Sequence, residues 1–284
     1  MHSIKLTLAY DGTEFHGWQI QPGQPTIQGL VSEVLHQLTQ EQLTLHGAGR
    51  TDAGVHAWGQ VASFKTHSEL APEDFVRALN ALLPPSVRVR SVDEAGPDFH
   101  ARWLAQAKTY HYCIYRGSIV PPSCWRWVLH EPCPLDFAAM ANAARHFEGE
   151  RDFTSFAASS GSEEHDRERT TVRTIYRSEW VRVPARPVLD LPAGEVAMDS
   201  EEWIYVVRGK SFLRHMVRKI VGTLLEVGRG RFAASDIPSL LERRDRICSG
   251  PTAPAQGLWL VSVEYPDPAD PLKSLSTKTR GDAP

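Results

Sequence analysis

The chain has 284 residues, of which 42% are hydrophobic and 23% are charged, and its formal net charge is −3. This length allows one large domain or two smaller ones, and the apolar content argues against disorder for most of the chain. None of the four cysteines has C-x-x-C spacing, which argues against a zinc site and against a disulfide framework.

The first predicted element is a strand, because residues 4–10 alternate between apolar and polar side chains. This alternation differs from the continuous apolar stretch of a signal peptide. The most apolar helical stretch, 212–227, is interrupted by three basic residues, so we expect no membrane-spanning segment. We therefore expect a cytoplasmic protein.

The first hundred residues predict the order β-α-β-β-α-β, which is the ferredoxin-like pattern. Thr26 is suited to cap a helix whose apolar residues run to Leu38, and Pro72 is suited to begin a second helix. The further strands expected in this half are 43–46, 60–65 and 87–92.

The second half predicts the same order with insertions, although no sequence repeat is detectable. Ser211 is expected to cap a helix that ends at Gly228. The other expected elements are strands at 108–116, 171–183, 203–208 and 257–265 and helices at 135–147 and 237–243. Two such halves side by side can form one broad sheet, a common platform for RNA.

We divide the chain into an N-terminal half, 1–104, a C-terminal half, 105–266, and a disordered tail, 267–284. The proline-rich stretch 184–194 is expected to be a variable loop.

The stretch 46–59, HGAGRTDAGVHAWG, is a glycine-dense loop that also carries Arg50, Asp52 and His56. It lacks the Gly-Lys-Ser/Thr of a phosphate-binding loop, and Asp52 stands where a GxGxxG pattern needs glycine. One carboxylate is too few for a calcium loop, and the set is poorly suited to other metals. Asp52 could act as a nucleophile or general base, or Asp52 and Arg50 could simply bond the backbone of their own turn.

Neighbouring segments add aromatic and basic residues. Trp18 lies in a long glycine-containing loop, 10–22, where it could cover a ligand or cap the core. Tyr110 and Tyr112 share one face of their strand. On the predicted helix, Arg214 and Arg218 form a ridge at i, i+4 spacing, and because Arg218 borders apolar residues we expect it to have a specific partner.

The chain resembles the TruA family of tRNA pseudouridine synthases. The motif GAGRTDAGVHA carries most of this resemblance, and further matches occur in family order up to about residue 265. They are YDGTEFHGWQ, TIQG, DFHAR, KTYHY, DFTSF, FLRHMVRKIVG and APAQGLWL. Trp259 stands where a tyrosine is more usual, and the segment 157–169 is longer and more acidic than expected.

The resemblance implies an α+β fold in which two ferredoxin-like, split β-α-β halves join into one largely antiparallel sheet. It implies helices on one side, an active-site cleft between the halves, a homodimer and no cofactor or metal. The implied reaction converts uridine to pseudouridine at positions 38, 39 and 40 of the tRNA anticodon stem-loop.

The family motifs assign residue roles to matching positions of this chain. Asp52 is the essential carboxylate, Tyr110 stacks on the uracil, and Arg218 reaches Asp52 from the other half. Arg50 is expected to keep Asp52 ionised as well. The expected substrate-binding residues are Arg50, Lys210, Arg214, Tyr110, Trp18 and His56, although for His56 we favour holding the loop by hydrogen bonds over a catalytic part.

Two other functions remain open from the residues alone. A nucleosidase or glycosidase could use Asp52 as its acid, but glycosidases generally need two facing carboxylates. A non-catalytic RNA-binding or chaperone module would need the basic segment 208–231 but not Asp52, which repels phosphate.

Overall fold

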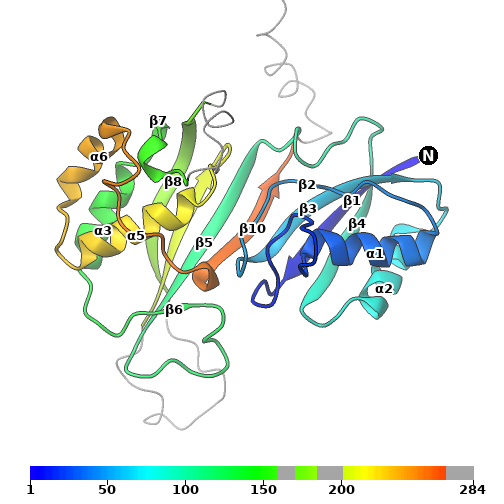
Figure 1. Ribbon diagram of the computed structural model, residues 1–284, viewed down its shortest axis with the longest axis horizontal. Helices are drawn as coiled ribbons and strands as arrows, with labels where there is room; N and C mark the ends of the chain where they lie inside the picture. Colours follow the sequence, from blue (N-terminus) through cyan, green and yellow to red (C-terminus); the bar gives the residue numbers. More distant parts are fainter. Residues whose placement is uncertain (159–169, 184–200, 267–284) are drawn as a thin grey trace, which may run out of the picture.

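The computed structural model describes residues 1–158, 170–183 and 201–266 (Figure 1). The predicted loop at 184–194, the tail at 267–284 and most of the acidic segment 157–169 lie outside the described residues. Among the described helices, none combines the length and apolarity that crossing a bilayer requires.

The first half contains the six predicted elements in the predicted order. They are β1 (His2–Tyr10), α1 (Ile27–Thr39), β2 (His46–Gly47), β3 (His56–Thr66), α2 (Pro72–Leu82) and β4 (Val87–Ala95). Thr26 caps α1 as predicted, because its hydroxyl accepts a hydrogen bond from the Gly29 amide at 3.3 Å. β2 is shorter and later than the strand expected at 43–46.

The second half follows the same plan with additions. Its elements are β5 (Ala107–Arg116), β6 (Leu129–His130), α3 (Phe137–Arg145), β7 (Gly149–Asp152), η1 (Thr154–Phe156), β8 (Val172–Val183), β9 (Glu201–Gly209), α5 (Met216–Gly228), η2 (Ala234–Asp236), α6 (Ile237–Arg243), η3 (Ala255–Gly257) and β10 (Leu258–Glu264). α6 has the predicted bounds.

One ten-stranded sheet joins the halves, in the order β4-β1-β3-β10-β5-β9-β8-β7 with β2 on β3 and β6 on β5. Within each half the four main strands follow the ferredoxin-like order, which is β4-β1-β3-β2 in the first and β10-β5-β9-β8 in the second. Neighbouring strands are antiparallel except β10 with β3 and β6 with β5. The predicted α+β fold with a largely antiparallel sheet is therefore confirmed.

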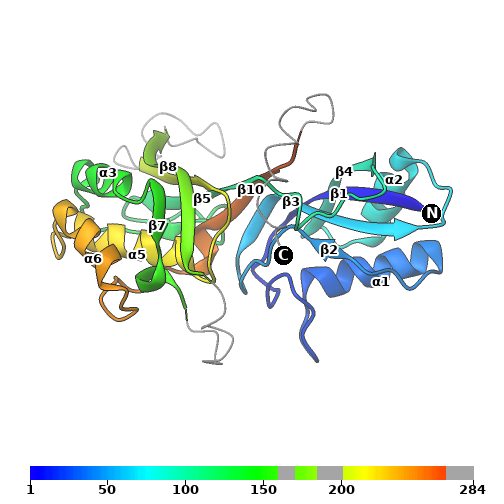
Figure 2. The same cartoon turned by 90° about the horizontal axis from the view of Figure 1, so that it is seen from above.

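The helices cover one face of this sheet. The inward side chains of β1 and β5 alternate along each strand and belong to a single core cluster with residues of α1, α2, α3, α5 and α6. Along the sheet, α1 and α2 lie at one end of the molecule and α3, α5 and α6 at the other end, with β10 and β5 between them (Figures 1 and 2).

The predicted start of the long basic helix is wrong by more than one turn. α5 begins at Met216 and not after Ser211, and its N-cap residue His215 has a left-handed backbone with φ of 59°. Phe212 and Arg214 therefore lie outside the helix, and the predicted Arg214–Arg218 ridge does not exist. The i+4 pattern of apolar residues extends past the helix because Phe212, in the loop after β9, packs against Tyr110 of the adjacent strand β5.

Candidate active site

The Asp52 loop connects β2 to β3 and packs directly on the loop 10–22. Gly17 has φ of +87°, and a side chain there would lie 2.4 Å from the carbonyl oxygen of Thr51. The Trp18 amide donates to the same carbonyl at 3.1 Å, and the Gly54 amide donates to Phe15 at 3.3 Å. The glycines of both loops therefore allow close backbone contact between two protein segments.

Trp18 caps the core beneath this loop. Its side chain is only 2% exposed, and a Cβ on Gly47 would lie 2.5 Å from the indole ring. Of the two roles expected for Trp18, the structure therefore shows the cap on the core, and a contact with a ligand stays a prediction.

His56 holds four segments together from a fully enclosed position. Its Nδ1 accepts a hydrogen bond from the Gly12 amide at 3.0 Å, and its Nε2 lies 3.1 Å and 3.0 Å from the carbonyl oxygens of Arg126 and Gln256. Burial lowers the pKa of His56, although Asp11 opposes this effect. His56 has 0% of its surface exposed and holds the loop by hydrogen bonds, which is the role we favoured, whereas its inclusion among the substrate-binding residues stays a prediction.

The carboxylate of Asp52 meets Arg218 of α5, as predicted. The Arg218 Nη1 lies 3.3 Å from Asp52 Oδ2, and the Arg218 Nε donates to the carbonyl oxygen of Ala253 at 2.7 Å. A Cβ on Gly222 would lie 1.7 Å from the carbonyl oxygen of Pro251, so this glycine lets the segment carrying Ala253 lie against α5. The guanidinium is thereby fixed at one edge and presents the other to Asp52.

The turn around Asp52 does not use the carboxylate. Within the described ranges, the polar contacts of the Asp52 side chain go to α5 and its cap, and none goes to its own loop. The alternative in which Asp52 only bonds its own turn is therefore wrong. Arg50 was expected to lie beside Asp52 as a second cation. Its Nε instead donates to Gln19 at 3.2 Å, and Arg50 forms no ion pair with Asp52 in the structure.

The sequence did not indicate His215 as part of this site. Its Nε2 lies 3.6 Å from Asp52 Oδ2. Burial lowers the pKa of His215. Asp52 raises this pKa, and the positive charges of Arg218 and other basic neighbours offset part of that rise. His215 is therefore uncharged at neutral pH, and Arg218 supplies the positive charge beside Asp52. The one sequence signal that could have placed His215 at the start of α5 is that histidine tolerates the left-handed backbone better than most residues.

Tyr110 lies at the base of the same site, on the helix-covered face of β5. It is 8% exposed, and its ring packs edge-to-face on Phe212 with the centroids 5.1 Å apart. Burial raises the pKa of the Tyr110 hydroxyl, and Tyr10 and Asp52 raise it further. The hydroxyl therefore stays protonated at neutral pH.

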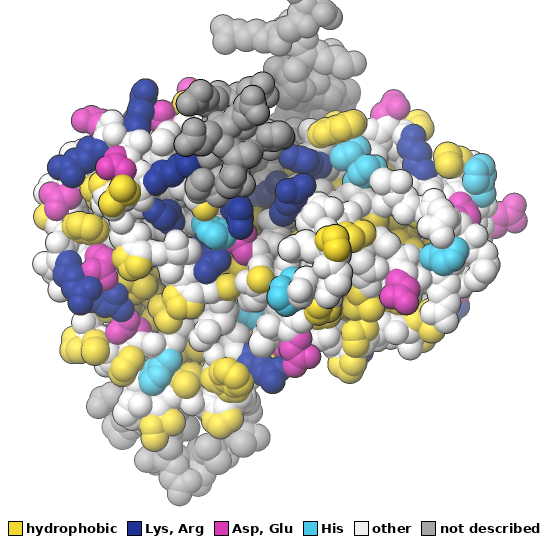
Figure 3. Space-filling view, in the orientation of Figure 1, with side chains coloured by type: hydrophobic (Ala, Val, Ile, Leu, Met, Phe, Trp, Pro, Cys, Tyr) yellow, Lys and Arg dark blue, Asp and Glu magenta, His cyan; other side chains and the backbone are white. Residues whose placement is uncertain are grey.

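A small hollow of about 50 Å³ lies between the two halves. Its lining comprises Arg50, Thr51, Asp52, Val55, Tyr110, Phe212, Leu213, Arg214, His215, Met216, Val217, Arg218 and Leu258. Lys210, at the end of β9, is exposed and does not line it. Three arginines, Arg50, Arg214 and Arg218, belong to this lining. Figure 3 shows Lys and Arg side chains gathered near the middle of the face that it presents.

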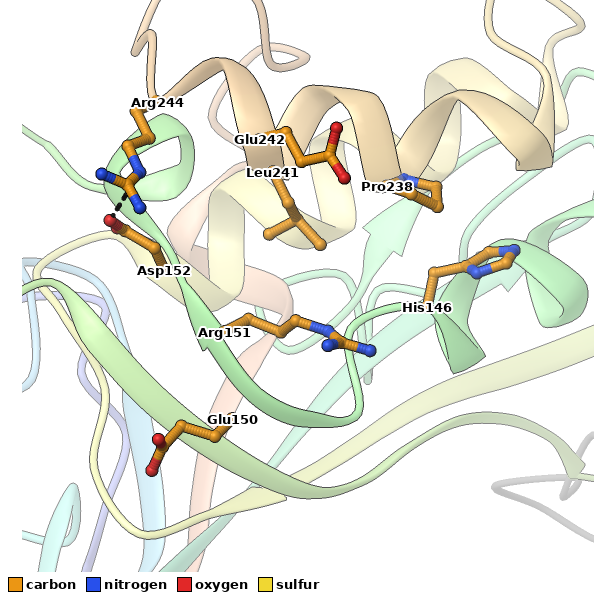
Figure 4. A pocket seen from close by; sticks show the side chains of 8 residues that line it. All are labelled: His146, Glu150, Arg151, Asp152, Pro238, Leu241, Glu242 and Arg244. Carbon is orange, nitrogen blue, oxygen red and sulfur yellow. Dashed lines mark ion pairs between the residues drawn. The ribbon is translucent and has the colours of Figure 1, made fainter.

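A larger hollow of about 590 Å³ lies elsewhere, among the end of α3, β7 and α6 (Figure 4). Its charged side chains include both signs, and Arg244 Nε lies 3.0 Å from Asp152 Oδ2. All of its lining residues belong to the C-terminal half of the chain. Nowhere in residues 1–158, 170–183 and 201–266 do three or more His, Cys, Asp or Glu side chains gather to hold a metal ion.

Comparison with known proteins gives one consistent result. A family model described as tRNA pseudouridine synthase matches residues 7–103 and 143–266. A protein of Solibacter usitatus named tRNA pseudouridine synthase A is 47% identical over 265 residues, which cover 93% of this chain and 100% of that protein. Proteins of Desulfotalea psychrophila, named tRNA pseudouridine synthase A 1, and of Caldicellulosiruptor saccharolyticus, named tRNA pseudouridine synthase A, are 41% and 39% identical with the same coverage.

Similarity to solved structures is much weaker. The chain aligns with the crystal structure of an archaeal box H/ACA sRNP Nop10-Cbf5 complex at a TM-score of 0.30 and 13% identity, covering 78% of this chain and 44% of that chain. An overlap of this size carries no argument about fold or partners.

Proposed function

The chain belongs to the tRNA pseudouridine synthase family, and from this membership we propose that it isomerises uridine to pseudouridine at positions 38, 39 and 40 of the tRNA anticodon stem-loop. Three curated relatives named as tRNA pseudouridine synthases are matched over their whole length.

The observation that carries the proposal is the state of Asp52. The carboxylate lies on the family motif, at a hollow between the halves, and its partners among the described residues come from the other half of the chain. A carboxylate that served only the fold would bond its own turn. Asp52 is instead 26% exposed and faces the space where a substrate would enter.

The reaction breaks the N1–C1′ bond of uridine, turns the base and forms a C5–C1′ bond, after which the proton on C5 leaves and a proton is held on N1. Substrate and product are isomers, so the overall change needs no redox or phosphoryl donor. The Arg218 guanidinium lies 3.3 Å from the Asp52 carboxylate, and an ionised carboxylate is the form needed both for a nucleophile and for a general base. Both roles remain open for Asp52.

A uracil base needs more room than the hollow has in this structure. A space of about 50 Å³ holds a few water molecules, and Phe212 occupies the edge of Tyr110. We propose that the flipped base displaces Phe212 and stacks on Tyr110. The cost of extruding a base is a few kcal/mol, comparable with the gain from such stacking.

Basic residues around the hollow are suited to the RNA backbone. Arg50 and Arg214 line it and are exposed, and Lys210 lies exposed at the nearby end of β9. We propose these three as phosphate contacts, together with a homodimeric, cytoplasmic enzyme as the family resemblance implies. Size-exclusion chromatography with light scattering measures the oligomeric state directly.

The test is incubation of the purified protein with an unmodified tRNA transcript, followed by carbodiimide mapping of pseudouridine. We expect modification at one or more of positions 38, 39 and 40 and no free uracil. Release of free uracil would support a nucleosidase, and tRNA binding without any modified base would support a non-catalytic RNA-binding module.

A further inference from the structure

Lys108 is a half-buried lysine at the edge of the candidate active site. It lies on β5 two residues before Tyr110, so the two side chains share one face about 7 Å apart. A Cβ on Gly49 would lie 3.0 Å from the Lys108 amine nitrogen, which places the amine directly over the loop that carries Asp52.

The Lys108 amine has no hydrogen bond or ion pair to any residue that the structure describes. Two other lysines show the usual arrangement. Lys219 donates to the carbonyl oxygen of Arg246 and to the Ser249 hydroxyl, each at 2.8 Å, and Lys5 lies 3.5 Å from Asp93. A partly buried ammonium without an acceptor destabilises the fold, because it has lost water contacts and gained none in return.

A second cation increases this cost. Arg102 lies close enough to repel Lys108, and burial together with this repulsion lowers the pKa of the Lys108 amine to about 8. The groups on the neighbouring strands do not neutralise it, since Lys108 pairs in register with Gly209 and Val263, and the nearby Glu264 binds Arg208 in a bidentate pair at 2.7 Å and 2.6 Å. The site therefore has the charge and the free donors to bind an anion.

We propose that the Lys108 ammonium, lying over Gly49 with Arg102 beside it, binds one backbone phosphate of the RNA strand next to the flipped uridine. This inference rests on the proposed function, which brings a polyanion into the adjacent hollow. The phosphate supplies an acceptor that the described residues do not provide, and the absence of a Cβ at Gly49 lets the Lys108 amine lie directly against the loop.

The first experiment measures the dissociation constant of an unmodified tRNA transcript between about 50 and 200 mM salt for the wild type, Lys108→Met and Lys65→Met. Lys65 is an exposed lysine on β3 and serves as the matched control. We expect Lys108→Met to bind about tenfold more weakly and to reduce the slope of log K against log salt by about one. Lys65→Met should match the wild type.

Thermal unfolding separates a binding role from a structural one. We expect Lys108→Met and the second variant Lys108→Gln to melt at the wild-type temperature or above it, because each removes an unpaired buried charge. A lower melting temperature in both variants would assign Lys108 to the fold and overturn the proposal.

The phosphate itself is identified with anticodon stem-loop RNAs that each carry one neutral methylphosphonate. The wild type should lose about tenfold in affinity at one position, and Lys108→Met should lose nothing further there. A salt slope unchanged by Lys108→Met overturns this inference alone if the wild type forms pseudouridine. If the wild type forms no pseudouridine, the proposed function fails, whatever the phosphate scan shows.

Discussion

Two hollows of this molecule contain the same three residue types, an aspartate, an arginine and a histidine, and arrange them differently. The hollow between the halves contains Asp52 with Arg218, and the hollow beside α6 contains Asp152 with Arg244. The two carboxylates are about equally buried, at 26% and 20% exposed. Burial therefore does not distinguish them.

The difference lies in what the carboxylates bond. Asp152 Oδ1 accepts from the Thr154 amide and hydroxyl at 3.0 Å and 2.7 Å and from the Thr171 hydroxyl at 2.6 Å. Burial alone would raise the pKa of Asp152, but these hydrogen bonds outweigh it and the pKa is lowered. Asp52 has no such local donors, so it is held in place by the other half and keeps lone pairs free. A saturated carboxylate stabilises a loop, whereas a partly satisfied one can react.

The largest expected effect is on Asp52. Asp52→Ala should reduce pseudouridine formation by at least about 10⁴-fold, because the reacting carboxylate is removed. The dissociation constant for tRNA should stay within about threefold, since a carboxylate does not attract phosphate. Filter binding and carbodiimide mapping measure the two quantities, and weaker binding with normal turnover would reverse the assignment.

The next largest difference should be between the effects of Arg218 and Arg244 on the reaction rate. Arg218→Ala should slow the reaction about 100-fold while the protein remains folded, because Asp52 loses its charged partner. Arg218 is 16% exposed and fixed by Ala253, whereas Arg244 is 68% exposed. Arg244→Ala is the matched control and should leave the rate within about twofold. Equal rates for the two variants would contradict the comparison.

His215 should have a smaller effect than Arg218. His215→Asn preserves a residue type that tolerates the left-handed backbone, so the start of α5 should remain. We expect a loss of about tenfold in turnover, because the contact with Asp52 is changed but its charged partner stays. A single-turnover rate below that of Arg218→Ala would show that the imidazole, and not the guanidinium, is the main support of Asp52.

Asp152 should affect stability and not activity. Asp152→Ala removes three accepted hydrogen bonds and should lower the free energy of unfolding by about 2 kcal/mol at neutral pH. The pKa of Asp152 is lowered in the folded protein, so its stabilisation is present above the unfolded pKa and is lost as pH falls through the folded pKa. The difference between wild type and variant should therefore shrink below about pH 4, as urea unfolding at several pH values measures. A constant difference down to acid pH would mean that the ionised form is not what stabilises the turn.

Much of the fold was accessible from local sequence signals. The Thr26 cap, the bounds of α6 and the duplicated β-α-β-β-α-β order follow from capping chemistry and hydrophobic periodicity, which act over a few residues. The start of α5 did not follow, because periodicity cannot distinguish a helical Phe212 from one in the loop after β9 that packs on Tyr110. That contact is made between β5 and a loop about 100 residues later in the chain, which local periodicity does not report.

The site was predicted where a motif specifies it and missed where only tertiary contacts do. Asp52, Arg218 and Tyr110 meet as expected. Trp18 and His56 are enclosed, and Arg50 bonds Gln19. That Lys108 has no partner among the described residues appears only once its neighbours are placed. A sequence shows which groups exist, whereas satisfaction of a buried polar group depends on partners up to 200 residues away, as for His56 and Gln256.

The most direct test of the role of Asp52 is a single-turnover measurement with enzyme in excess over an unmodified tRNA transcript, comparing Asp52→Asn with Asp152→Asn. Asparagine keeps the shape of aspartate but cannot ionise, so only the charge is removed. We predict no pseudouridine with Asp52→Asn, although the tRNA is bound, and a rate close to wild type with Asp152→Asn. Pseudouridine formed by Asp52→Asn at a rate similar to that of Asp152→Asn would contradict the assignment of Asp52 as the reacting carboxylate.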